Sequence, residues 1–460
     1  MVSITTLINS GLLLVGKWIY QGLATHQQVA EEQYNIIRFL GGSAPYIQSP
    51  GYGISTDFPM GCTIEQVQLL SRHGERYPTL NKGNEFEKVL EKLLDHSQEY
   101  KGSMAFLNDY EYFVTDKSQY ALETTPENSE GTYAGTTNAF RHGAYFRNRY
   151  DTIFNSSQEL PVFTTNSKRV FNTAEIFTQG FLGEEYSRER VKYNIFAESE
   201  ELGVNSLTPR YACTTYNKDA NSDLVTSFSK LYLTNILARL NEENPFLTID
   251  EDDVKTLFDF CAYELNVKST SSFCDLFTTE DFAYYGYDND LDKYYSSGPG
   301  NNMSAIIGSV YLNASLNLLK DNSNPNKIWL SFTHDTDIDH YISALGIFTP
   351  ERDLPLDRVD FERQYYHAYL VPQGARFYTE KLKCGEDTFV RYVINDSVQP
   401  IPQCQNGPGF SCEISEYESF VKQVLQSNSI AGCRVSNHVD KALTFFWDYQ
   451  SRNYTADLEL

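Results

Sequence analysis

The spacing of hydrophobic and polar residues predicts a chain that alternates strands with helices. At 64–70, Val67 and Leu69 alternate with polar neighbours before the run closes on an apolar pair, a pattern typical of a strand. Similar short runs recur at 161–164, 327–333 and 377–393. Between them lie long tyrosine-rich stretches that suit helices, such as 86–94 and 224–240. The pattern favours an α/β fold with a helical insertion.

Directly after the first predicted strand comes the segment Arg72-His73-Gly74-Glu75-Arg76-Tyr77-Pro78. Loops that leave the carboxyl end of a buried strand often carry ligand chemistry in open α/β sheets. This loop presents one imidazole between two guanidinium groups. Guanidinium forks match phosphate oxygens, and an imidazole among them can attack phosphorus. The segment predicts phosphoryl transfer through a phosphohistidine.

Chain length and net charge limit the domain organisation and the class of partner. The chain has 460 residues, but no Pro/Gly/Ser-rich linker divides it, which favours one catalytic unit with an inserted subdomain. Its formal net charge of −24 argues against nucleic acid as a partner, because phosphate backbones require a basic surface. An anionic substrate must then be attracted by a local cationic cleft.

The N-terminal residues predict export. An apolar stretch at 7–16 is followed by small residues near Gly22-Leu23-Ala24, so we predict a signal peptide at 1–24 and a mature chain at 25–460. No later stretch approaches the roughly 18 apolar residues of a membrane span. Residues 11–17 nearly match a phosphate-binding loop, but Trp18 stands where Ser or Thr is required, and no strand precedes the first glycine.

Cysteines and sequons fit an oxidising compartment. The eight cysteines contain no C-x-x-C pair, and short separations favour the bridges Cys261–Cys274 and Cys404–Cys412. Glycosylation sequons occur at Asn155, Asn302, Asn313, Asn395 and Asn453. The histidines outside the candidate site form no ligand cluster, so neither a metal nor a cofactor is expected.

Three more motifs follow the heptad in order. They are Thr165-Asn166-Ser167-Lys168-Arg169, His334-Asp335 after the run at 329–333, and Val371-Pro372-Gln373-Gly374-Ala375-Arg376. With these motifs the chain resembles the histidine acid phosphatases, most closely the secreted fungal branch of yeast acid phosphatases and phytases. The resemblance spans about residue 40 to the C-terminus.

The resemblance implies an architecture. The family has a large, phosphoglycerate-mutase-like α/β domain and a smaller, mostly helical domain inserted over the active-site cleft. Here the helical part is expected at about 86–155 and 205–295. The resemblance also implies the remaining disulfides, Cys62–Cys384 and Cys213–Cys433.

Matching positions imply roles for individual residues. His73 would be the nucleophile, and Arg72, Arg76 and Arg169 would bind the phosphate. His334 would donate a hydrogen bond to a phosphoryl oxygen. Asp335 would protonate the leaving alkoxide, which leaves poorly without a proton.

Two other patterns partly match motifs of different chemistry. The run 335–339 fits neither an aspartyl-phosphate motif nor a calcium loop, because Asp339, His340 and Gly346 break the defining positions. A second Arg-His-Gly at 141–143 lacks the following arginine and proline and lies in a helix-like stretch. We interpret it as structural.

The expected activity is that of a secreted or cell-wall acid phosphomonoesterase acting on phosphate monoesters, including phytate. Lys82 resembles a lysine that contacts the inositol ring in mould phytases, whereas Glu75 and the segment 332–338 resemble yeast acid phosphatases. A repressible-type acid phosphatase with little phytase activity is therefore an alternative. A mutase-like phosphotransferase, an inactive cell-wall binding protein and a homo-oligomer also stay open.

Overall fold

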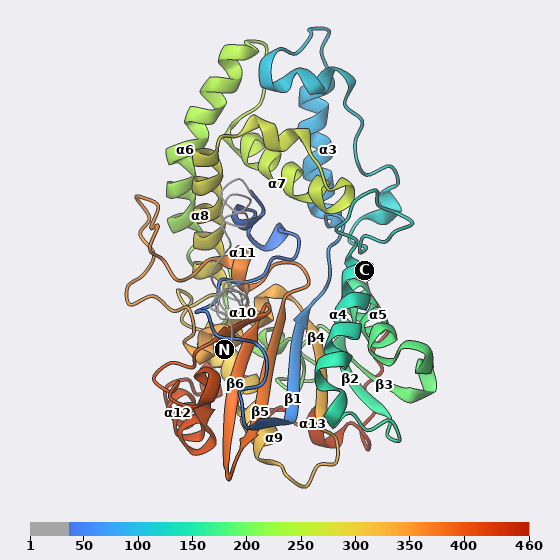
Figure 1. Cartoon of the computed structure of the whole chain (residues 1–460). Coiled ribbons are helices and arrows are strands. Elements are labelled where there is room, and N and C mark those ends of the chain that lie inside the picture. Colours follow the sequence, from blue (N-terminus) through green and yellow to red (C-terminus); the bar gives the residue numbers. More distant parts are fainter. Residues whose placement is uncertain (1–35, 460) are drawn as a thin grey trace, which may run out of the picture.

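A computed structural model describes residues 36–459 (Figure 1). The signal peptide predicted at 1–24 lies outside the described residues. The chain forms one eight-stranded mixed sheet in the order β3-β2-β4-β1-β5-β6-β7, with β8 beside β6. Its strands are β1 (Cys62–Arg72), β2 (Leu160–Thr165), β3 (Val191–Phe196), β4 (Ile328–Thr333), β5 (Arg376–Cys384), β6 (Asp387–Ile394), β7 (Ser397–Gln399) and β8 (Cys412–Glu413).

The sheet has a parallel half and an antiparallel half. Strands β3, β2, β4 and β1 run parallel to one another, whereas β5 pairs antiparallel with β1 and β6 pairs antiparallel with β5. The strand-like run predicted at 377–393 is therefore a hairpin, with its turn at Gly385 in the left-handed region. Strand β3 was not predicted. The α/β fold class is confirmed.

Helices cover both faces of the sheet. On one face, α4 (Gly135–Tyr150) and α5 (Lys168–Leu182) pack against Val67 and Leu69 of β1. The other face is covered by α9 (Ser304–Lys320), α10 (Asp335–Leu345), α12 (Ile414–Ser427) and α13 (Phe445–Asp448). The polar residues that alternate with Val67 and Leu69 on β1 face these helices and are also buried. Gln66 donates to Leu318 O, and Gln68 donates to Ser315 O.

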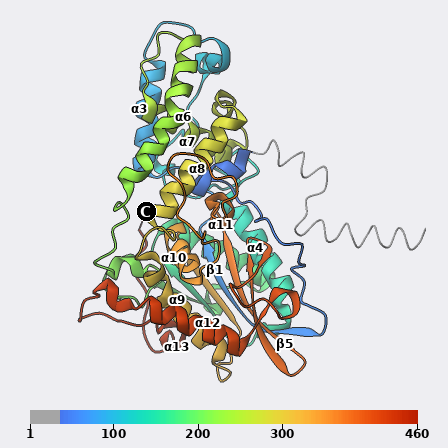
Figure 2. The same cartoon turned by 90° about the vertical axis from the view of Figure 1, so that its left-hand side faces the viewer.

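A helical part lies beyond one end of the sheet, at the top of Figures 1 and 2. It contains α3 (Leu80–Leu94), α6 (Ser222–Glu243), α7 (Glu251–Lys268) and α8 (Thr279–Ser296). Aromatic rings fill its interior, as where Phe258 stacks on Phe277 and Tyr285. The expected range 205–295 covers α6, α7 and α8. The expected range 86–155 extends too far, because it includes α4, whose Phe146 and Tyr150 pack against the sheet.

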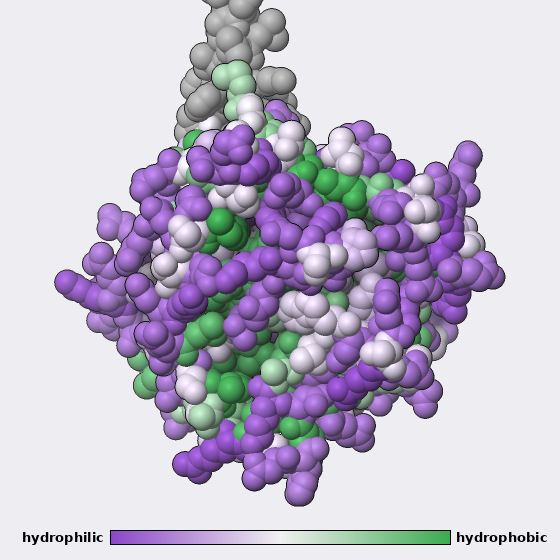
Figure 3. Space-filling model, turned by 90° about the horizontal axis from the view of Figure 1, so that it is seen from below, coloured by the Kyte–Doolittle hydropathy of each residue, from purple (hydrophilic) through white to green (hydrophobic). Residues whose placement is uncertain are grey.

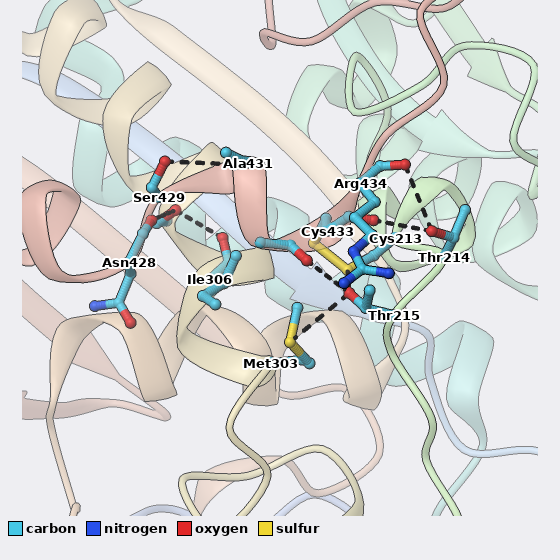
Figure 4. Close-up of a disulfide and its surroundings, with 12 residues drawn as sticks. Cys213, Thr214, Thr215, Met303, Ile306, Asn428, Ser429, Ala431, Cys433 and Arg434 are labelled. Carbon is cyan, nitrogen blue, oxygen red and sulfur yellow. Dashed lines mark hydrogen bonds between the residues drawn. A yellow bond between two sulfur atoms is a disulfide. The ribbon is translucent and has the colours of Figure 1, made fainter.

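Two disulfides join distant parts of the chain, and two are local. The pairs are Cys62–Cys384, Cys213–Cys433, Cys261–Cys274 and Cys404–Cys412, the pairing that separation and family resemblance implied. Cys62 and Cys384 are opposite one another on β1 and β5. Figure 4 shows the Cys213–Cys433 bridge, beside which Thr214 donates to Cys433 O.

The sequons differ in exposure. Asn155, Asn302, Asn313 and Asn453 are exposed and stay candidates for glycosylation. Asn395 is fully buried, and its amide nitrogen donates to Tyr369 O (2.7 Å) and Leu370 O (3.0 Å). The expectation for Asn395 was wrong, because a glycan cannot be joined to a nitrogen that is enclosed in the folded core.

The face at the bottom of Figure 1 is mainly hydrophilic, with smaller apolar areas between polar side chains (Figure 3). Among residues 36–459, no helix combines the length and apolar character that crossing a membrane requires.

Helices α4 and α5 are in backbone contact at two glycines. A Cβ at Gly143 would overlap the carbonyl oxygen of Phe177, and one at Gly180 would overlap that of Phe140. Neither neighbour can yield easily, because both atoms belong to a helix backbone. Gly143 is also the last residue of the second Arg-His-Gly.

We predict that Gly143→Ala lowers the free energy of unfolding by about 2 kcal/mol, as forced overpacking does. Helix propensity alone would give the opposite sign, a gain of about 1 kcal/mol. Urea denaturation measures the change. The exposed Ala144→Gly on the same helix is the control and should lose about 1 kcal/mol through propensity. A more stable Gly143→Ala protein would contradict the contact.

Candidate active site

The register of the parallel strands brings the predicted site residues to one edge. Arg72, the last residue of β1, is paired with Thr333, the last residue of β4. Thr164 of β2 is paired with Phe332 of β4, so β2 ends at the same level. The loops that follow these strands therefore begin side by side. They carry His73 and Arg76, then Arg169, and then His334 and Asp335.

His73 is buried at the centre of this edge. Its Nδ1 lies 2.9 Å from Gly74 O, and its ring is 5.7 Å from the ring of His334. If Nδ1 donates to this carbonyl, Nε2 keeps its lone pair. Burial, followed by the charges of Arg72, Arg169 and Arg76, holds the pKa of His73 well below its usual value. The site therefore favours the neutral imidazole.

Arg72 is fixed by backbone carbonyls. Its Nη1 donates to Gly42 O (2.7 Å) and Val371 O (2.6 Å), while Nη2 lies 3.3 Å from Asp335 Oδ2. Gly42 precedes the sheet and Val371 follows α11 (His367–Leu370), so three distant segments hold one guanidinium. Its Nε has no partner among residues 36–459.

Arg76 and Arg169 complete a group of three guanidiniums. The Arg76 backbone N–H donates to Gln373 Oε1 (2.8 Å), and its side chain lies over the ring of Tyr263 in α7. Arg169 is in the first turn of α5. Burial and then the charge of Arg76 lower the pKa of Arg169 to about 10. As at Arg72, the Nε of each lacks a partner in the described part of the chain.

His334 is paired with an acid that the sequence did not indicate. Its Nε2 lies 2.5 Å from Glu198 Oε1. Burial alone would raise the pKa of Glu198, but the hydrogen bond and charge of His334 lower it to about 2. Burial lowers the pKa of His334 despite this carboxylate. Glu198 follows β3, so recognising that strand would have placed it at this edge.

Asp335 is the first residue of α10 and is 21% exposed. Besides Arg72, it lies 3.7 Å from Lys293 Nζ of α8. Burial alone would raise the pKa of Asp335, but Arg72, Lys293 and the nearby histidines hold it well below its usual value. The carboxyl is therefore ionised in this state of the site.

Asp337, two residues on, is in a different environment. It forms a buried ion pair with Arg210, and burial raises its pKa to about 6. Thr333 Oγ1 lies 3.4 Å from the same carboxylate. Asp337 is therefore held within a structural pair.

Lys82 belongs to α3 of the helical part and is 31% exposed. Its Nζ lies 2.6 Å from Glu85 Oε2 and 2.9 Å from Asp259 Oδ2 of α7. Two carboxylates therefore offset its charge. A role of Lys82 in substrate binding stays a prediction.

The second Arg-His-Gly is structural, as interpreted. His142 is buried in α4, and its Nε2 lies 2.7 Å from Tyr378 Oη of β5. Burial holds its pKa well below the usual value. Its ring packs edge-on against Phe177 of α5.

Sequence reasoning missed other residues that border the site. Lys293 and Glu123 lie in segments without a motif, and only the packing brings them to the strand edge. Gln373 lies in a tract that the sequence did single out. Its side chain receives Arg76 N–H and donates to Ser43 O, which ties the loop to the segment before β1.

Comparison with known proteins agrees with this geometry. The family model of the histidine phosphatase superfamily (branch 2) matches residues 63–395. A phytase of Candida albicans is 53% identical over 462 residues, covering 100% of both chains. A repressible acid phosphatase of Saccharomyces cerevisiae is 40% identical over 462 residues, covering 98% of this chain and 97% of the relative.

Solved structures give the same result. The crystal structure of the phytase from D. castellii superposes with a TM-score of 0.92 at 52% identity, covering 95% of each chain. The chain belongs to the histidine phosphatase superfamily, branch 2.

Proposed function

We propose that the protein is a secreted acid phosphatase that hydrolyses phosphate monoesters, including phytate, through a phosphohistidine. One observation carries the proposal: the buried His73 imidazole, with Nδ1 2.9 Å from Gly74 O, lies among the guanidiniums of Arg72, Arg76 and Arg169, and the Asp335 carboxyl lies 3.3 Å from Arg72. The phytase relatives at 53% and 52% identity support the substrate. The disulfides and exposed sequons support secretion.

In the first step, Arg72, Arg76 and Arg169 bind the phosphoryl oxygens. Fixed donors of this kind stabilise the charge that spreads over the equatorial oxygens in the transition state. His73 Nε2 forms a bond to phosphorus while the bond to the ester oxygen breaks. The leaving alkoxide takes a proton from Asp335. The products are the phosphohistidine and the free alcohol.

In the second step, water attacks the phosphohistidine. The Asp335 carboxylate accepts one proton from this water as the new P–O bond forms and the P–N bond breaks. Inorganic phosphate leaves, and His73 and the protonated Asp335 are restored. The cycle requires no redox or metal step.

Asp335 must gain a proton before it can donate one. Arg72 and Lys293 keep it ionised without a ligand. A bound phosphate dianion supplies negative charge beside those same cations and thereby raises the pKa of Asp335. Substrate binding and an acidic medium together produce the proton donor.

His334 faces a similar requirement. Its Nε2 is occupied by Glu198, so donation to a phosphoryl oxygen uses Nδ1 and requires the imidazolium form. Glu198 on one side and the phosphoryl group on the other both stabilise that form. Glu198 therefore sets the charge of His334 in the complex.

We predict that His73→Ala abolishes turnover of p-nitrophenyl phosphate while the protein still folds, because the side chain serves chemistry. Rapid quenching with labelled substrate should place phosphate on His73 in the wild type. The exposed His438→Ala is the control and should keep full activity. Label recovered on an aspartate or a serine would overturn the mechanism.

Asp335→Asn separates proton donation from positioning. The first-step rate should fall about 10²- to 10⁴-fold for alkyl phosphates and phytate, which is the usual contribution of a general acid. The first-step rate with p-nitrophenyl phosphate should fall much less, because its phenolate leaves without a proton. In the wild type, the rate with alkyl phosphates should decline as rising pH leaves Asp335 ionised. Presteady-state kinetics measures these rates, and equal losses for both leaving groups would exclude Asp335 as the donor.

Lys82→Met tests the phytate contribution of the helical part. If Lys82 contacts a second phosphate of phytate, KM for phytate should rise several-fold while KM for p-nitrophenyl phosphate stays constant. The control is Lys88→Met, an exposed lysine of the same helix. Unchanged phytate kinetics would mean that Lys82 serves only its pairs with Glu85 and Asp259.

A further inference from the structure

The segment 121–124 lies alongside the nucleophile loop. Ala121 N–H donates to Pro78 O, Tyr77 N–H to Leu122 O and Thr124 N–H to Glu75 O, at distances of 2.8 to 2.9 Å. Arg76 and Glu123 form an antiparallel bridge between these hydrogen bonds. The pairing places the Glu123 side chain beneath Gly74.

Glu123 is almost completely buried, at 3% exposure. Its Oε1 accepts from Gly74 N–H (3.1 Å) and contacts Thr173 Oγ1, and its Oε2 accepts from Asn172 Nδ2 (2.7 Å). Gly74 N–H also points at Thr173 Oγ1, at 2.9 Å. No cation forms an ion pair with Glu123 within residues 36–459. This single acid connects the nucleophile loop to α5.

Both ends of this connection lead to catalytic groups. Gly74 O is the acceptor that orients the His73 ring. Asn172 and Thr173 follow Arg169 by three and four residues, one helical turn on α5, and Thr173 Oγ1 lies 3.0 Å from Arg169 O. A shift of Glu123 would therefore change the placement of His73 relative to Arg169.

We propose that Glu123 is a positioning residue, in its protonated form, for the nucleophile His73 and the phosphate-binding Arg169. The inference rests on the proposed function and adds a residue and a protonation state to it. Glu123 itself does not reach the reacting atoms. It holds two of the groups that do.

Burial without a cation partner among residues 36–459 favours the protonated form, and the hydrogen bonds can accommodate it. Thr173 has one hydroxyl hydrogen, which cannot serve both Glu123 and Arg169 O. A protonated Glu123 donates to Thr173 Oγ1, and Thr173 then donates to Arg169 O, so each group is satisfied. Burial, with a contribution from the charge of Glu75, raises the pKa of Glu123 to about 7. The groups that face it are the Glu75 carboxyl, Gly74 N–H, the Asn172 amide and the Thr173 hydroxyl.

The pH consequence has a definite sign. Because the folded protein binds this proton more tightly than the unfolded chain does, the stabilisation is complete below the usual glutamate pKa. It is lost as pH rises through the folded value near 7. At neutral pH a buried carboxylate without a cation is costly. The connection between the loop and α5 should then weaken.

The test compares Glu123→Ala, Glu123→Gln and the exposed control Glu127→Gln. At pH 4.5, Glu123→Ala should lower the first-step rate with p-nitrophenyl phosphate about 10- to 100-fold, because misplacing a reacting group by about 1 Å costs that much. In Glu123→Gln the amide oxygen can take the place of Oε1 and accept from Gly74 N–H and the Thr173 hydroxyl, while the Asn172 amide turns over and accepts from the new NH2. This neutral variant should therefore restore the rate to within about three-fold of the wild type. The Glu127→Gln protein should match the wild type.

Thermal denaturation provides a readout that is independent of activity. Between pH 4.5 and pH 7, the Tm of Glu123→Gln should decrease less than the Tm of the wild type, because the neutral amide does not ionise. A folded Glu123→Ala protein with a first-step rate within two-fold of wild type would overturn the inference. Two results would overturn the protonated form. One is an equal loss of first-step rate in Glu123→Gln and Glu123→Ala, and the other is a parallel dependence of Tm on pH in the wild type and Glu123→Gln.

The proposed function can fail separately. If the wild type does not hydrolyse p-nitrophenyl phosphate, the Kd for inorganic phosphate at pH 4.5, measured by calorimetry, decides the role of Glu123. A roughly ten-fold weaker Kd in Glu123→Ala, restored in Glu123→Gln, would support positioning of Arg169. An unchanged Kd would overturn it.

Discussion

The structure depends on concentrating positive charge at the end of one buried strand. Arg72, Arg76 and Arg169 surround His73, although the chain carries a formal net charge of −24. Like charges held close together are costly without a counter-ion, and burial increases that cost. The fold therefore fixes Arg72 by two backbone carbonyls, and Arg76 by the carbonyl of Tyr77 and contact with the ring of Tyr263. A phosphate group is the ligand whose charge and oxygen geometry best relieve the repulsion.

The acids of the site have different properties because their neighbours differ. Asp335 is kept ionised by Arg72 and Lys293, whereas burial raises the pKa of Asp337 to about 6 even beside Arg210. The hydrogen bond and charge of His334 lower the pKa of Glu198 to about 2. Burial raises the pKa of Glu123, which pairs with no cation of residues 36–459, to about 7. These environments separate the proposed proton donor, Asp335, from residues that hold other groups.

Residues of the helical part contact the site directly. From α7, Tyr263 supports Arg76 and Asn266 donates to Ser43 O (3.1 Å), while α8 supplies Lys293 to Asp335. These contacts cross from the helices to the sheet edge. Any displacement of the helical part would therefore change both the proposed phosphate-binding arginines and the charge around Asp335.

The sequence by itself determined the motifs and their order, because the chemistry of Arg72-His73 and of His334-Asp335 lies in adjacent residues that follow apolar runs. It also indicated the α/β class and the local disulfides. Only the tertiary structure decided that α4 belongs to the sheet, that Asn395 is buried, and that Glu198, Lys293 and Glu123 border the site. The physical reason is that strand register and packing, which depend on residues far apart in the chain, determine burial and partners. A local pattern contains no record of either.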